Sequence, residues 1–327
     1  MWSRARFARL GVSVVLLAVL SAMVWRPGPT PIVFETPQIS ADGTRYRDRV
    51  FADLEIHRDV EFSDLGGMFW SRGLKMDVFE PAGDDETNRP VFVVLFGGGF
   101  VQGERRTVEG WARDFAHRGY VAAAIDYRLL DDFPETEAEL RIGHARASQD
   151  AVAALRFLRS DIERWGVRTD AGIVGGLSAG GFVGATVGTV GAGQTLPPAE
   201  LAYFEEVGGL EADGVSRDGL SEVQGILNIG GGMFGLEAID ASDAVLYAAH
   251  YEEDPIVRCG TSSDDAWSLG VEVHGSCSVI ERYAQLGIPH EFFLIEDEVG
   301  HGDFSDADME SILAGAADLF FAEVVQP

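Results

Sequence analysis

Short, almost entirely apolar runs recur along this 327-residue chain, each six or seven residues long. The runs cover residues 91–96, 121–126, 172–177, 223–229, 244–250 and 291–296. Runs of this kind are typical of strands that are buried on both faces, as in a parallel sheet. Two earlier segments, residues 54–62 and 74–81, predict an opening pair of antiparallel strands.

Helical patterns lie between the apolar runs. The clearest has one apolar stripe, which ends at Gly166 and consists of Val152, Leu155, Leu158, Ile162 and Trp165. The last helix is expected to start near Ser305, with Asp308 as its capping-box partner. This alternation of strand and helix predicts a doubly wound α/β fold with a mostly parallel sheet, whose ligands bind at the carboxyl ends of the strands.

One segment, residues 191–222, interrupts the alternation. It reads "GAGQTLPPAELAYFEEVGGLEADGVSRDGLSE", which is acidic, rich in glycine and broken by two prolines. We interpret it as an insertion after a strand and helix. Two roles remain open for it: a lid over the site, or a plain surface excursion.

The N-terminus has the layout of an export signal. Arg4, Arg6 and Arg9 precede a charge-free run over residues 10–25, and no clear cleavage site follows. We therefore expect residues 1–26 to be an export signal or membrane anchor, residues 27–45 a linker, and residues 46–327 the catalytic domain. The protein would then be periplasmic, secreted or anchored to the membrane.

The charge balance limits the partners. With 25 basic and 53 acidic residues the formal net charge is −28, which argues against nucleic acid and anionic membrane surfaces and disfavours acidic substrates. Membrane contact is expected only through the N-terminal segment.

Cys259 and Cys277 are the two cysteines, too few for a zinc site or a disulfide-rich scaffold. In an oxidising compartment they would form one disulfide; two unpaired thiols are the alternative.

The segment "GGLSAGG" directly follows an apolar run and opens a helix of small residues. It contains a G-x-S-x-G motif centred on Ser178, which in this context predicts a sharp strand-to-helix turn that exposes the serine hydroxyl above the sheet. A serine needs a base to become nucleophilic, and the base needs a carboxylate to orient it.

His301 is the expected base, because it falls on a glycine-flanked loop after the final strand. His250 lies within an apolar run, while His274 and His290 stand just before a helix and a strand. The expected acid is Asp254, since Pro255 fixes a turn after it. Alternatives for the acid are Glu252, Glu253, Asp264 and Asp265.

The segment "FGGGF", residues 96–100, follows the first apolar run of the sheet. Three successive glycines are costly, because glycine loses much backbone freedom on folding. Acyl transfer builds negative charge on a carbonyl oxygen, and bare backbone N–H groups stabilise it well. These glycines are therefore expected to form part of an oxyanion hole, with the N–H of Ala179 as a further donor.

The motifs "FGGGFVQGE", "IDYRL", "GLSAGG", "HYEEDPIV" and "GHGDF" together resemble the α/β-hydrolase superfamily. The similarity is to single-domain bacterial esterases and lipases of the hormone-sensitive-lipase or feruloyl-esterase type, and it extends from about Leu74 to the C-terminus. It implies a triad of Ser178, Asp254 and His301.

The same resemblance implies oxyanion donors at Gly98, Gly99 and Ala179, and scaffold roles for Asp126 and Arg128. Phe96 is a departure, since this loop usually begins with histidine in the family. We expect packing of the Phe96 ring to hold the loop in place.

The sequence thus predicts a serine carboxylesterase that forms a covalent acyl-enzyme and acts on a small-molecule ester, without a metal or organic cofactor. Two alternatives remain. One is an amide hydrolase of the same fold, such as an arylformamidase or small-peptide hydrolase. The other is a non-catalytic binding protein on a hydrolase fold.

Overall fold

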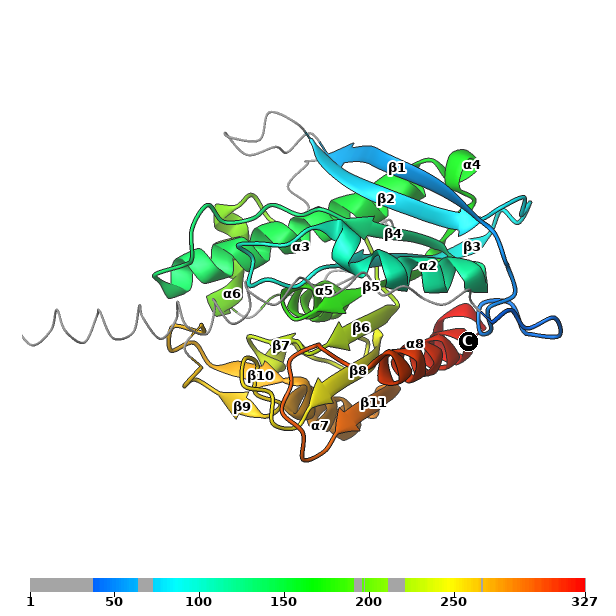
Figure 1. Cartoon of the computed structure of the whole chain (residues 1–327). Helices are drawn as coiled ribbons and strands as arrows, with labels where there is room; N and C mark the ends of the chain where they lie inside the picture. Colours follow the sequence, from blue (N-terminus) through cyan, green and yellow to red (C-terminus); the bar gives the residue numbers. More distant parts are fainter. Residues whose placement is uncertain are drawn as a thin grey trace, which may run out of the picture.

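An eight-stranded sheet with the order β1-β2-β4-β3-β5-β6-β8-β11 runs through the middle of the molecule (Figure 1). The structure is a computed structural model that describes residues 38–63, 73–190, 196, 198–210, 221–265 and 267–326. The strands of the sheet are β1 (Leu54–Ser63), β2 (Leu74–Pro81), β3 (Arg89–Leu95), β4 (Val121–Ile125), β5 (Val167–Leu177), β6 (Gly225–Ile229), β8 (Val245–Tyr251) and β11 (His290–Ile295).

Strand directions agree with the expected α/β class. β1 pairs with β2 and β2 with β4 in antiparallel fashion, whereas every pairing from β4 to β11 is parallel. All residues of β3, β4, β6 and β8 are buried. The predicted antiparallel pair and the six apolar strands are therefore confirmed. Burial on both faces holds for these four strands and for most of β5, whereas it was wrong for β11, which is half-buried to exposed because it lies at the edge of the sheet.

Helices cover both faces of the sheet. They are α2 (Glu109–Arg118), α3 (Glu137–Ser160), α4 (Ile162–Trp165), α5 (Ala179–Thr189), α6 (Pro198–Glu206), α7 (Ser276–Leu286) and α8 (Asp306–Phe320). Short turns of other helix types are η1 (Arg105–Val108), η3 (Leu236–Ala238) and the π turn η4 (Phe321–Val325).

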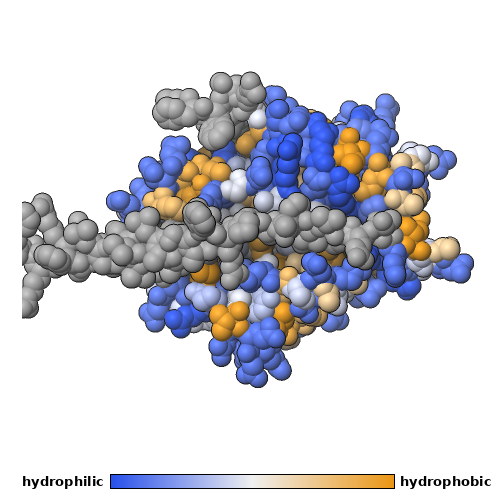
Figure 2. All heavy atoms as spheres, viewed as in Figure 1, coloured by the Kyte–Doolittle hydropathy of each residue, from blue (hydrophilic) through white to orange (hydrophobic). Residues whose placement is uncertain are grey.

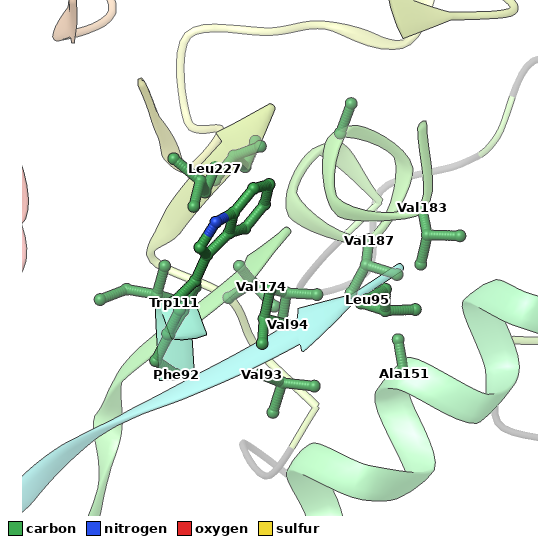
Figure 3. Packing of buried hydrophobic residues seen from close by; sticks show 14 of the residues in the cluster. Phe92, Val93, Val94, Leu95, Trp111, Ala151, Val174, Val183, Val187 and Leu227 are labelled. Carbon is green, nitrogen blue, oxygen red and sulfur yellow. The ribbon is translucent and has the colours of Figure 1, made fainter. Parts of the chain in front are cut away.

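Neighbouring residues of β3 show which helices cover which face, because successive strand side chains point to opposite sides. Phe92 packs on Phe115 of α2, with ring centroids 4.4 Å apart, and Phe115 contacts Phe320 of α8. Leu95 points to the other face, where Figure 3 shows it between Val187 of α5 and Ala151 of α3. The core therefore lies on both sides of β3, and the end of this strand is packed against α5.

The predicted helix over residues 152–165 is broken. α3 begins earlier, at a capping box formed by Thr136 and Glu139, and ends at Ser160. Asp161 leaves the helical conformation (φ −125°, ψ 69°), and its side chain accepts the N–H of Arg164 to start α4. Beyond this break only part of the predicted stripe is buried, because Trp165 packs in the core whereas Ile162 is 46% exposed. The predicted stop at Gly166, which has φ 59°, is confirmed.

A second, three-stranded sheet was not predicted. Its strands are β7 (Gly232–Met233), β10 (Val273–Gly275) and β9 (Thr261–Ser262), in the order β7-β10-β9. Strands of two or three residues are too short to show an alternating pattern. The predicted last helix is confirmed, since Ser305 is the N-cap of α8 and its Oγ accepts the N–H of Asp308 at 3.1 Å.

The proposed export signal, residues 1–26, lies outside the described residues, as do the first part of the linker and much of the insertion. Among the helices in the described ranges, none has the length and apolarity needed to cross a membrane. The described part of the insertion contains α6, which packs on α3. Buried Arg141 forms an ion pair with Glu200, and Gln149 Nε2 donates to Val207 O at 2.9 Å. On the face drawn in Figure 2, hydrophilic residues predominate between small hydrophobic patches.

Candidate active site

Ser178 stands on a tight turn between β5 and α5. Its backbone has φ 51° and ψ −113°, an uncommon conformation for a residue other than glycine. A Cβ at Gly176 or at Gly180 would overlap the carbonyl oxygen of Leu95, so both flanking positions require glycine. The turn therefore holds Ser178 in a fixed place beside the end of β3, as the G-x-S-x-G motif predicts.

His301 connects Ser178 to Asp254. His301 Nε2 lies 2.9 Å from Ser178 Oγ, and His301 Nδ1 lies 2.7 Å from Asp254 Oδ2. The carboxylate can only accept, so Nδ1 carries the proton and Nε2 is left to accept from the serine hydroxyl. The structure thus brings together the serine, base and acid expected from sequence, although they are up to 123 residues apart.

Asp254 is held by its own loop. Its Oδ1 accepts the N–H groups of Ile256 at 2.8 Å and Val257 at 3.0 Å, and its side chain is fully buried. The turn at Pro255 makes both bonds possible, because it directs these N–H groups back to the carboxylate. Asp254 therefore presents its second oxygen to His301 in a fixed orientation.

The other acid candidates have different surroundings. Glu252 accepts the N–H of Asp297 at 3.1 Å, and Glu253 is exposed. Asp264 is exposed as well, while Asp265 pairs with Arg258 at 3.2 Å. Of the candidates for the acid, only Asp254 contacts His301 in the described part of the chain.

The other three histidine candidates lie away from Ser178. His250 is buried in β8, and His274 of β10 contacts Thr261 Oγ1 at 2.8 Å through Nδ1. His290 is the first residue of β11, and its Nδ1 lies 2.7 Å from Ile288 O.

The "FGGGF" loop lies directly against Ser178. A Cβ on Gly97 would come within 3.1 Å of Ser178 Cβ. Gly98 has φ 127°, and its carbonyl accepts from Val101 and Gln102 in a tight turn. Within the described ranges, the N–H groups of Gly98, Gly99 and Ala179 have no acceptor. Their lack of an acceptor is consistent with the oxyanion role expected from the sequence, which stays a prediction.

Phe96 is held by packing, as expected. It is 1% exposed, and its ring stacks on that of Tyr127 with centroids 4.2 Å apart. The hydroxyl of Tyr127 donates to Phe96 O at 3.0 Å, and burial raises the pKa of Tyr127. Tyr127 was missed from sequence. Its position in "IDYRL", just after β4, was the available signal, because β4 and β3 are neighbours.

Asp126 and Arg128, the expected scaffold residues, flank Tyr127. Arg105 Nη1 contacts Asp126 Oδ2 at 2.5 Å, which ties the end of the glycine loop to β4. Arg128 Nε donates to buried Asp150 of α3 at 2.9 Å. Together these ion pairs fix both the glycine loop and the loop that carries Tyr127.

Among the described residues, Glu55, His57 and Glu80 form one group with atoms close enough to share a metal ion. The group lies on β1 and β2. His57 Nε2 contacts Glu80 Oε1 at 2.7 Å, and Nδ1 faces the Arg164 guanidinium at 3.2 Å. Since the guanidinium only donates, Nδ1 must accept and Nε2 carries the proton. Neither nitrogen has a free lone pair, so this group does not fit a metal ion.

Cys259 and Cys277 form a disulfide, with Cα atoms 5.0 Å apart. The bridge joins the loop after Asp254 to the first turn of α7, and Cys277 N also donates to Cys259 O at 2.8 Å. The loop that carries the acid is therefore fastened to a helix.

Comparisons with known proteins find similar esterases. The family model described as BD-FAE matches residues 76–212. Carboxylesterase 1D of Mus musculus is 36% identical over 114 residues, which cover 33% of this chain and 19% of that protein. Esterase LipI of Mycobacterium tuberculosis is 29% identical over 149 residues, which cover 45% of this chain and 43% of that protein. The chain thus matches less than half the length of these curated relatives.

Similar solved structures cover most of the chain. Thermogutta terrifontis esterase 2, phosphoramylated by tabun, has a TM-score of 0.57 and 19% identity, covering 85% of this chain and 96% of that one. A truncated carbohydrate esterase from gut microbiota has a TM-score of 0.56 and 14% identity, covering 83% and 97%. At these identities the likeness is one of fold, and the fold is shared over nearly the whole length of both structures.

Proposed function

We propose that this chain, a member of the α/β-hydrolase superfamily, hydrolyses carboxylic esters with Ser178 as its nucleophile. The hydrogen-bonded sequence from Ser178 through His301 to Asp254 carries the proposal, because it is the arrangement that makes a serine hydroxyl nucleophilic. The unpaired N–H groups beside Ser178 support it, as do the names of the relatives, which are esterases.

The first half-reaction would form an acyl-enzyme. Ser178 Oγ attacks the ester carbonyl while His301 Nε2 takes the hydroxyl proton, and Asp254 stabilises the resulting imidazolium. Gly98, Gly99 and Ala179 donate their N–H groups to the oxyanion of the tetrahedral intermediate. Collapse of this intermediate breaks the bond to the alcohol oxygen, which leaves with the proton from His301.

The second half-reaction would release the acid. A water molecule occupies the place of the departed alcohol and gives a proton to His301 as it attacks the acyl carbon. The same three N–H groups hold the second oxyanion. Ser178 leaves with the proton from His301, which restores the starting state. The residues present account for each proton transfer, so the proposal calls for no metal or organic cofactor.

Labelling by a fluorophosphonate probe tests the nucleophile. The wild-type protein should be labelled at Ser178 and should hydrolyse p-nitrophenyl acetate. Ser178→Ala should lose both, while Ser160→Ala, on the exposed C-terminal end of α3, should keep both. Retained hydrolysis in Ser178→Ala would refute the mechanism. A wild-type protein that neither reacts with the probe nor hydrolyses esters would instead favour a binding protein on this fold.

Amide hydrolysis by the same residues is the second candidate activity, because a serine, histidine and aspartate triad also catalyses that reaction. The names of the relatives favour esters. Rates on matched ester and anilide substrates with the same acyl group decide between them. The substrate we propose is a small neutral ester, because the net charge of −28 disfavours anions.

We also propose that the protein works outside the cytoplasm. The N-terminal arginines and apolar run suggest export, and the disulfide independently suits an oxidising compartment. Fractionation of cells that express the full chain tests this. Recovery of all activity in the cytoplasmic fraction, with both thiols reduced, would contradict it.

A further inference from the structure

Beneath the loop of Asp254 lies a buried chain of hydrogen bonds that the reaction above does not use. His250, near the end of β8, is 0% exposed. Its Nδ1 lies 2.8 Å from Ser276 Oγ at the start of α7, and its Nε2 lies 2.8 Å from Val257 O. The imidazole therefore links α7 to the loop that holds the acid.

The partners fix the protons of His250. The carbonyl of Val257 only accepts, so Nε2 carries the hydrogen and Nδ1 accepts from the Ser276 hydroxyl. The Ser276 hydroxyl also lies 3.4 Å from Gly231 O, which is a longer and weaker alternative. Burial lowers the pKa of His250, which keeps the ring neutral. Both ring nitrogens are satisfied in this neutral tautomer.

We propose that His250 and Ser276 are positioning residues for the catalytic carboxylate of Asp254. His250 holds the carbonyl of Val257, and the N–H of the same residue donates to Asp254 Oδ1 at 3.0 Å. The carbonyl and the N–H belong to the two peptide units on either side of the Val257 Cα atom, so holding the first restricts the backbone rotation that would turn the second away from Asp254. This inference rests on the proposed function, because it assigns a part in the same reaction.

The neutral state of His250 also matters for charge. Its Nε2 lies 3.4 Å from Asp254 Oδ2, the same oxygen that His301 Nδ1 reaches at 2.7 Å. The charged or titratable groups that face His250 are Asp254 and His301. His301 in turn faces Asp254 and, through its backbone N–H, Asp303 Oδ1 at 2.9 Å. Because His250 is neutral, the charge of Asp254 acts on the His301 imidazolium alone.

The disulfide closes this arrangement. Cys259 lies two residues after Val257, and Cys277 directly follows Ser276. The bridge therefore fixes the separation between the two segments that His250 connects. The loop of Asp254 is thus held to α7 and β8 by the disulfide and by the two hydrogen bonds of His250.

Steady-state kinetics of His250→Leu, His250→Gln and Ser276→Ala test the proposal, with p-nitrophenyl acetate as substrate. His250→Leu should lower kcat about 10- to 100-fold with KM changed less than about twofold, because a misplaced catalytic group slows chemistry more than binding. His250→Gln retains an N–H donor and should recover part of this loss. The kcat of Ser276→Ala should lie between that of the wild type and that of His250→Leu.

The pH dependence of kcat/KM separates positioning from loss of folded protein. If Asp254 is displaced, the His301 imidazolium is less stabilised and the acid limb moves to lower pH. A smaller fraction of folded enzyme would lower the whole profile without moving the limb. Ser278→Ala, two residues from Ser276 on α7, is the matched control and should leave the profile unchanged.

The outcomes separate this inference from the proposed function. Activity in the wild type with an unchanged kcat and acid limb in His250→Leu would overturn the positioning role alone. An inactive wild type would overturn the proposed function. If His250→Leu does not fold, His250→Gln and Ser276→Ala decide. If both variants have the wild-type pH profile of kcat/KM, the inference is refuted. If the acid limb of the Ser276→Ala profile is shifted, the inference is supported.

Discussion

The ring of Phe96 stacks on the ring of Tyr127, with centroids 4.2 Å apart and planes 18° from parallel. The hydroxyl of Tyr127 also donates to the carbonyl of Phe96, so one residue fixes both the side chain and the backbone of the other. The Phe96 ring also lies so close to Gly103 that a Cβ there would overlap it. Aromatic packing and one hydrogen bond thus hold the head of the glycine loop.

Phe96→Ala should therefore lower both stability and turnover. Removing a fully buried phenylalanine typically costs about 3–5 kcal/mol, and a displaced oxyanion donor costs on the order of 10²-fold in kcat. Thermal unfolding and kcat on p-nitrophenyl acetate measure the two effects. Tyr127→Phe is the matched control, because it keeps the stacked ring and loses only the hydrogen bond. Tyr127→Phe should lower the free energy of unfolding by about 1–3 kcal/mol and should change kcat little. A Phe96→Ala enzyme equal to wild type in both respects would rule out this role of Phe96.

The acid can be tested in the same assay. Asp254→Asn should lower kcat about 10³- to 10⁴-fold, because an amide in place of the carboxylate favours the wrong tautomer of His301. The neighbouring Glu253→Gln should retain nearly full activity, since Glu253 is exposed and has no contact with His301 among the described residues. If the losses were reversed, Glu253 would be the acid instead.

Much of this arrangement could be predicted from sequence because its signals are local. The apolar strands, the turn at Ser178 and the loop of His301 each depend on a few consecutive residues. The order of serine, acid and histidine along the chain then leaves four histidines, and the loops on which His301 and Asp254 lie single out these two residues. Asp254 is an example: Pro255 beside it is visible in the sequence and makes the turn that holds its carboxylate.

The contacts that support the site could not be predicted, because they join distant segments. Tyr127 meets Phe96 across 31 residues, and His250 meets Ser276 across 26. The position of Tyr127 just after β4 places it near the end of β3, but the residues beside it do not indicate that its hydroxyl donates to the glycine loop. The break at Asp161 could not be predicted either, because the apolar spacing in the sequence continues past Asp161 while the backbone leaves the helical conformation there.

Reduction of the disulfide should weaken both the fold and catalysis. The bridge spans 18 residues, and closing a loop of that size contributes roughly 3 kcal/mol. Because the bridge fastens the loop of Asp254, kcat should fall at temperatures where the reduced protein is still folded. Melting temperature and kcat before and after dithiothreitol check this, with Cys259→Ala/Cys277→Ala as a permanently open variant. Full activity in the folded, open variant would show that the bridge serves stability alone.

Acid should destabilise the protein partly through His144 on α3. Burial lowers its pKa to about 3, well below the ordinary value of 6.5, while Arg141 nearby acts in the same direction. The folded state therefore excludes a proton that the unfolded chain binds below pH 6.5. The contribution of neutral His144 to the free energy of unfolding is therefore fully present above pH 6.5 and decreases as the pH falls toward 3.

His144→Phe should consequently reduce the pH dependence of unfolding. Its ring would face the same aromatic neighbours, Phe100, Phe204 and Phe234. Urea unfolding between pH 7 and pH 4 should show a slope that is smaller than in wild type by up to about 1.4 kcal/mol per pH unit in the acidic range. Identical slopes in the two proteins would mean that His144 does not contribute to acid sensitivity.

Two glycines of the oxyanion loop should differ in their tolerance of a side chain. At Gly98 a Cβ would overlap the carbonyl of Gln102, and φ is 127°. At Gly99 a Cβ would meet nothing within 4 Å among the described residues, and φ is 62°, which alanine adopts at a cost of about 1–2 kcal/mol. Gly98→Ala should therefore displace the loop, whereas Gly99→Ala should strain it without moving it far.

A trifluoromethyl ketone separates the two variants, because its hemiketal with Ser178 carries an oxyanion in the same position as the tetrahedral intermediate. Gly98→Ala should lower the affinity for the inhibitor and kcat by a similar factor, on the order of 10²-fold. KM should be nearly unchanged, because the lost donors act in the transition state. Gly99→Ala should retain most of the affinity for the inhibitor. If Gly98→Ala bound the ketone as tightly as wild type does, the N–H of Gly98 would not be an oxyanion donor, and the N–H groups of Gly99 and Ala179 would have to stabilise the intermediate.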